Sequence, residues 1–141
     1  MKPVGEDSGA RPLAVAILAG FLFFATAISI VVSSALLFPG PLLDWLAQFN
    51  RPAMSTFQAL APWPGILLAA LAVGTFAAAV GLLRGRKWAW WFSVVLFAVN
   101  GTGDLLSFLA TRDLIRSLSG VVIAAAFLIA LSTGSVRRYV R

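Results

Sequence analysis

The sequence predicts an all-α membrane protein, an antiparallel four-helix transmembrane bundle with short amphipathic interfacial helices in its first outer loop. Two observations on composition carry this prediction. The 141 residues are 60% hydrophobic and only 11% charged, whereas soluble domains have about 25% charged residues. Four long apolar segments approach or exceed the length needed to cross a bilayer. Short turns separate these segments, which favours antiparallel packing of neighbouring helices.

The expected domain organisation follows the apolar segments. Residues 1–12 are expected to form a flexible cytoplasmic tail, residues 13–134 the transmembrane domain, and residues 135–141 a basic cytoplasmic tail. The four spans are expected at residues 13–38, 66–83, 88–110 and 114–132. The first apolar run exceeds the roughly 7–15 residues of a signal-peptide core and follows acidic residues, so we expect it to be retained.

The segment 41–61, between the first two spans, has a mixed pattern. Apolar side chains recur there at the spacing of one helical face: Leu42, Trp45, Leu46 and Phe49. We expect two short amphipathic helices that lie on the membrane surface. The alternative is that these helices only cap the bundle.

Basic residues predict the orientation. Eight lie on the side of the two termini and the second loop: Lys2, Arg11, Arg84, Arg86, Lys87, Arg137, Arg138 and Arg141. Three lie on the other side: Arg51, Arg112 and Arg116. The positive-inside rule therefore places both termini in the cytoplasm. We expect a multi-pass protein of the bacterial cytoplasmic (inner) membrane.

Small residues four positions apart predict where helices approach one another. The second span has Ala70, Gly74 and Ala78, and the fourth has Gly120 and Ala124. Such residues let helix backbones come close in lipid, where no hydrophobic drive holds helices together. We expect these faces to pack within the monomer rather than to form a dimer.

The third span contains an unusual polar stretch, "AVNGTGDLLSF" at 98–108. Asn100 and Asp104 lie one turn apart on the same helix face and can share a hydrogen-bond network. Arg116 in the next helix is the expected charge partner of Asp104, with Arg112 second. We expect this cluster to anchor the third helix to the fourth. The alternative is a cation or proton site used for transport.

The basic turn "RGRK" predicts contacts with lipid. Arg84, Arg86 and Lys87 are candidates for binding anionic headgroups on the cytoplasmic side. The alternative is that they only determine topology. The formal net charge of +6 is concentrated at the ends of apolar segments, so anionic lipid is the expected partner and nucleic acid is not.

Composition excludes much chemistry. The chain has no cysteine and no histidine, which removes thiol nucleophiles, imidazole bases, Cys/His zinc sites and His-ligated haem. Only five acidic residues are present. We therefore predict no catalytic, cofactor-binding or metal-binding residues, and we expect no cofactor and no enzymatic activity.

Residues 80–106, "VGLLRGRKWAWWFSVVLFAVNGTGDLL", carry a resemblance. The basic turn running into tryptophan, the Asn with an Asp four residues on and the tail "VRRY" resemble a group of small, uncharacterised bacterial four-helix membrane proteins. The resemblance covers most of residues 13–141. It implies the topology and brings no known activity. Small multidrug transporters also have four short spans, but they depend on a glutamate in the first helix, and residues 13–38 contain no acidic residue.

These observations favour one function over another. We expect a non-enzymatic accessory or scaffold protein that acts through helix and lipid contacts, with a membrane-protein partner or a second copy of itself. The alternative is an oligomeric small transporter or channel that uses Asn100 and Asp104. A lipid-modifying enzyme is the remaining class, and it would need a nucleophile and a base other than cysteine and histidine.

Overall fold

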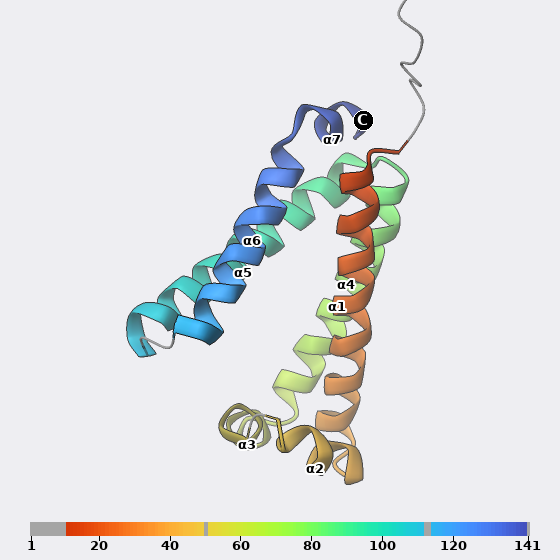
Figure 1. Ribbon diagram of the computed structural model, residues 1–141. Coiled ribbons are helices and arrows are strands. Elements are labelled where there is room, and N and C mark those ends of the chain that lie inside the picture. Colours follow the sequence, from red (N-terminus) through yellow and green to blue (C-terminus); the bar gives the residue numbers. More distant parts are fainter. Residues whose placement is uncertain (1–10, 50, 112–113, 141) are drawn as a thin grey trace, which may run out of the picture. The chain divides into compact units, whose positions relative to one another are not determined.

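The computed structural model describes residues 11–49, 51–111 and 114–140, and within these ranges it contains helices and no strands (Figure 1). The helices are α1 (Leu13–Leu37), α2 (Pro41–Ala47), α3 (Arg51–Ala59), α4 (Trp63–Leu83), α5 (Lys87–Thr111), α6 (Leu114–Ser132) and α7 (Gly134–Tyr139). The all-helical prediction is confirmed.

Three helices in the described part of the chain are long and apolar enough to cross a membrane: Leu13–Leu37, Trp63–Leu83 and Lys87–Leu106. They indicate a membrane protein. Helix α6 has the bounds predicted for the fourth span, but its apolar stretch among the described residues, Leu118–Ser132, is shorter than a span. The fourth crossing therefore stays a prediction.

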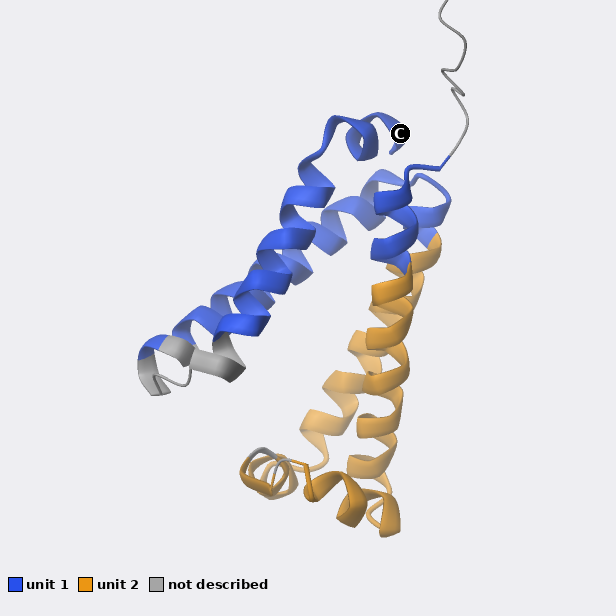
Figure 2. Cartoon of the chain, viewed as in Figure 1, with its two compact units in different colours: residues 1–19, 81–141 blue, residues 20–80 orange. Residues whose placement is uncertain are grey.

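The chain divides into two compact units (Figure 2). The first consists of residues 1–19 and 81–141, and the second of residues 20–80. Unit 1 thus contains the first turns of α1, the end of α4 and all of α5, α6 and α7. Unit 2 contains the remainder of α1 and α4 together with α2 and α3.

In unit 2, α1 and α4 run antiparallel and are joined by hydroxyl groups. The hydroxyl oxygens of Thr26 and Thr75 lie 2.8 Å apart. Further along α1, the Ser33 hydroxyl donates a hydrogen bond of 2.8 Å to the carbonyl oxygen of Gly65. Since the later residue of α1 meets the earlier residue of α4, the two helices run in opposite directions.

These hydroxyls are buried because each has an acceptor. Thr26 Oγ1 also lies 2.8 Å from the carbonyl oxygen of Leu22, and Thr75 Oγ1 lies 2.9 Å from that of Leu71. One hydroxyl of the pair therefore donates to its own helix while the other donates across the pair. A hydroxyl without an acceptor in lipid would cost several kcal/mol. The Thr26–Thr75 pair therefore satisfies two polar groups and also fixes the register of the two helices.

The short helices of unit 2 pack at one end of α1. A small apolar cluster holds them there: Ala35, Leu36, Leu43 and Met54. Of the predicted apolar face, Leu46 packs against this cluster, whereas Leu42, Trp45 and Phe49 are exposed. The exposed face remains available to a membrane surface.

In unit 1, α5 and α6 form a second antiparallel pair (Figure 2). The rings of Phe97 and Phe127 stack with centroids 4.9 Å apart. At the end of this pair, the Trp90 indole N–H donates a hydrogen bond of 2.9 Å to the carbonyl oxygen of Leu131. That carbonyl belongs to the last turn of α6, where backbone oxygens lack a partner within the helix.

The hydroxyl pair generates the first prediction. Thr75→Val keeps the shape of the side chain and removes its hydroxyl, so we expect it to lower the free energy of unfolding by about 0.6 kcal/mol, with ~1.7 kcal/mol as the upper end for bonds of this kind. Thermal unfolding of the detergent-solubilised protein measures this. The matched control is Thr102→Val, since that exposed hydroxyl bonds, within the described part of the chain, only to the Ala98 carbonyl oxygen of its own helix. Equal losses in the two variants would contradict the role of the pair.

Candidate functional site

Asp104, the centre of the predicted polar cluster, faces α6. Its side chain is half-buried, and its carboxylate occupies the space that a Cβ on Gly120 would fill. One turn earlier on α5, a Cβ on Gly101 would lie 3.0 Å from the Cβ of Ala124. The two helices therefore approach through glycines, and the acid sits in the space left by an absent side chain.

The other members of the predicted cluster are not seen to join Asp104. Asn100 is exposed on α5. Arg112 lies outside the described residues, and Arg116 is described only as part of the α6 backbone. The ion pair of Asp104 with Arg116 therefore stays a prediction. Asp104 instead lies in close contact with Gly120. The sequence singled out both residues but did not place them together.

The small-residue faces have mixed outcomes. Gly120 and Ala124 do face α5, as their spacing predicted. On α4, Ala78 is fully buried but Ala70 is exposed. Thr75 of α4, which is not a member of that predicted face, pairs with Thr26 of α1. The Thr75 hydroxyl is the sequence feature that could have indicated this contact. A single threonine in an alanine-rich apolar helix is, however, easily overlooked.

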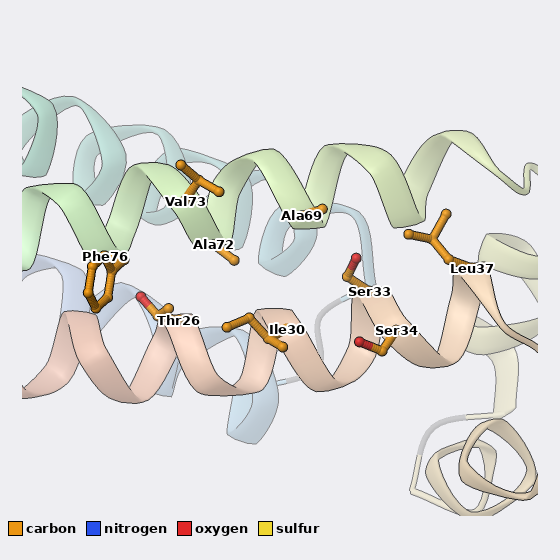
Figure 3. A pocket seen from close by; sticks show the side chains of 9 residues that line it. All are labelled: Thr26, Ile30, Ser33, Ser34, Leu37, Ala69, Ala72, Val73 and Phe76. Atoms are coloured by element: carbon orange, nitrogen blue, oxygen red, sulfur yellow. The ribbon is translucent and has the colours of Figure 1, made fainter.

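Unit 2 contains an apolar groove between α1 and α4 (Figure 3). Its volume is about 440 Å³, within the range of about 300–1,000 Å³ typical of small-molecule sites. The lining residues are Thr26, Ile30, Ser33, Ser34, Leu37, Ala69, Ala72, Val73 and Phe76. Because the Thr26 and Ser33 hydroxyls are already engaged in the α1–α4 contact, the groove suits an apolar occupant.

Unit 1 contains a smaller, basic pocket of about 240 Å³. Lys87, Trp90, Trp91, Arg137 and Val140 line it. The Arg137 guanidinium carbon lies 6.0 Å from the centroid of the Trp90 ring, which is within cation–π distance. The Trp90 and Trp91 rings meet edge to face with centroids 4.9 Å apart. The pocket thus combines two positive charges with two aromatic side chains.

Helix α7 is held against the turn between α4 and α5. The Tyr139 hydroxyl donates a hydrogen bond of 2.7 Å to the carbonyl oxygen of Leu83, the last residue of α4. Gly85 in the turn has a φ of +67°, and a Cβ there would lie 2.9 Å from the Tyr139 carbonyl oxygen. Position 85 therefore requires glycine for its backbone angle and for the close approach of α7.

The predicted headgroup residues separate in the structure. Arg84, Arg86 and Lys87 are all exposed, but of these only Lys87 lines the basic pocket, together with Arg137. Sequence reasoning assigned Arg137 to a tail and missed this role. No sequence pattern could join Arg137 to Lys87, because they are 50 positions apart and meet only when α7 folds back.

Among the described residues, no group of three or more His, Cys, Asp or Glu side chains is arranged to hold a metal ion. No protein-family model matches the chain, and it has no significant similarity to curated proteins or to solved structures. Its function is therefore inferred from its own side chains and geometry.

The contact of Asp104 with Gly120 generates the second prediction. Gly120→Ala would place a methyl group where the carboxylate lies, so we expect a loss of about 1–3 kcal/mol in the free energy of unfolding from overpacking. Gly103→Ala is the control, because a Cβ there meets nothing within 4 Å. That variant should be neutral or stabilised by up to about 1 kcal/mol, since alanine favours the helix. Thermal unfolding in detergent compares them, and a stable Gly120→Ala protein would refute the tight contact.

Proposed function

We propose that this protein is a small multi-pass integral membrane protein that acts without catalysis, as an accessory or scaffold subunit. The observation that carries the proposal is that buried polar side chains serve to hold the helices together. Among the described residues, every buried side-chain nitrogen and oxygen has a hydrogen-bond partner. The outward surface is strongly apolar, with Phe24 62%, Val73 71% and Ile129 69% exposed. Such a surface supports action through contacts with lipid and with other helices.

The proposed architecture is a four-span antiparallel bundle with α2 and α3 at the outer membrane interface. Two antiparallel pairs, α1 with α4 and α5 with α6, support it. The unequal distribution of basic residues supports cytoplasmic termini in a bacterial inner membrane. Labelling of Ser55→Cys but not Ser135→Cys by an impermeant thiol reagent in intact cells tests this orientation.

The accessory role predicts a stable protein partner. We expect the tagged full-length chain, extracted from its native membrane in a mild detergent, to co-purify with a second membrane protein or with another copy of itself. Native mass spectrometry of the extract measures the composition of the complex. The control is an unrelated tagged membrane protein of similar size, expressed to the same level. Recovery of the chain only as a monomer would contradict the proposal.

A transporter or channel is the second candidate function, and the half-buried Asp104 on a candidate span favours it. If Asp104 is a structural anchor, Asp104→Asn should lower the unfolding temperature, and the loss should shrink when Arg116 is also neutralised. If Asp104 serves transport, the same variant should abolish ion or proton flux into liposomes at unchanged stability. Flux equal to that of empty liposomes for the unaltered protein would exclude the transport function.

A further inference from the structure

In the basic pocket of unit 1, the two positive charges have no acidic side chain near them among the described residues. Lys87 is the first residue of α5, and Arg137 reaches the same pocket from α7. In the described part of unit 1, Asp104 is the only carboxylate side chain. It lies on α5 about 25 Å from Lys87, at 1.5 Å per residue. The two exposed cations are therefore open to an anion from outside the described residues.

We propose that this pocket binds the phosphate group of an anionic membrane lipid. The proposal rests on the proposed function, since it names the lipid contact through which the protein acts. A guanidinium group presents paired donors that match phosphate oxygens, and an ammonium group adds a point charge. The Trp90 ring lies against Arg137 and is itself held by its bond to Leu131. The guanidinium is thus positioned before any ligand arrives.

The location of the pocket favours a lipid over a soluble phosphate. Lys87 begins the candidate span Lys87–Leu106, so the pocket lies at the level where lipid headgroups meet the hydrocarbon core. Trp91 is 61% exposed, as expected for an aromatic side chain at a membrane interface. Because α6 runs antiparallel to α5, α7 emerges at the same interface. This placement holds whichever side of the membrane faces the cytoplasm.

The pocket is complete only when α7 is docked against the turn between α4 and α5. Arg137 reaches the pocket because Tyr139 bonds to Leu83 and packs its backbone against Gly85. Val140, which follows α7, forms an apolar wall and is buried. The neighbouring cations Arg84 and Arg138 are exposed and do not line the pocket. A diffuse basic surface would use these cations and the exposed Arg86 alike, whereas only Lys87 and Arg137 line this pocket.

A charge-matched pair of variants tests the site. The full chain is purified in mild detergent and titrated with phosphatidylglycerol or phosphatidylcholine, and bound lipid is counted by native mass spectrometry. The unaltered protein should retain phosphatidylglycerol in preference. Lys87→Gln/Arg137→Gln should bind it roughly thirtyfold more weakly, the factor expected for two basic residues at an anionic surface. Arg84→Gln/Arg138→Gln removes the same charge and should bind as the unaltered protein does. Equal losses in both double variants, or equal retention of the two lipids, would overturn the proposal.

A second variant removes no charge. Gly85→Ala should displace α7 and weaken phosphatidylglycerol binding although all eleven Lys and Arg residues remain. Unchanged binding by this variant would overturn the role of α7. Unfolding temperatures of all variants show whether each remains folded.

Displacement of the lipid by millimolar inorganic phosphate would assign the pocket to a soluble anion and overturn the lipid proposal. Co-purification of a protein partner is measured separately, so failure of the lipid site leaves the accessory role standing.

Discussion

The structure depends on one constraint, which is that polar hydrogens inside a bilayer must be satisfied by the protein itself. In the Thr26–Thr75 pair, one hydroxyl donates to the other, which in turn donates to a carbonyl of its own helix. At the helix ends, where backbone carbonyls lack intrahelical partners, aromatic side chains supply the donors. Trp90 donates to Leu131 and Tyr139 to Leu83. The same bonds that satisfy these groups also decide which helices lie together.

Close packing of the helices also requires space, which glycine provides at two positions. Gly120 makes space for the Asp104 carboxylate, and Gly85 admits the backbone of α7. Each close approach places a functional candidate: an acid between α5 and α6 in one case, and Arg137 beside Lys87 in the other. Gly103, by contrast, meets nothing within 4 Å. Glycine in this chain is therefore informative only where a neighbour occupies the position of its missing side chain.

The two candidate sites differ in what they can do chemically. Asp104 is packed into a helix–helix contact, which suits an anchor and also the alternative of a transport group. The basic pocket lies at the end of the α5–α6 pair and combines two cations with Trp90 and Trp91. Its composition suits an anionic headgroup. An accessory protein that holds lipid at one end and presents apolar helix faces along its length fits both features without any reactive side chain.

Sequence alone determined the helical class, the membrane character and the bounds of the four long helices to within three residues, because hydrophobic runs, prolines and turn glycines act locally. It did not predict the short helix α7, which it treated as a tail. It also identified Asp104, which is conspicuous as an acid in an apolar run, and Gly120 with Ala124, whose spacing defines one helix face. It did not connect Asp104 to Gly120, Thr26 to Thr75 or Lys87 to Arg137. It predicted the apolar face of α2 but not the packing of Leu43. Those relations depend on how far α7 folds back and on which faces of two alanine-rich helices meet. Only tertiary packing decides these, because many faces of such helices are almost equally apolar and small.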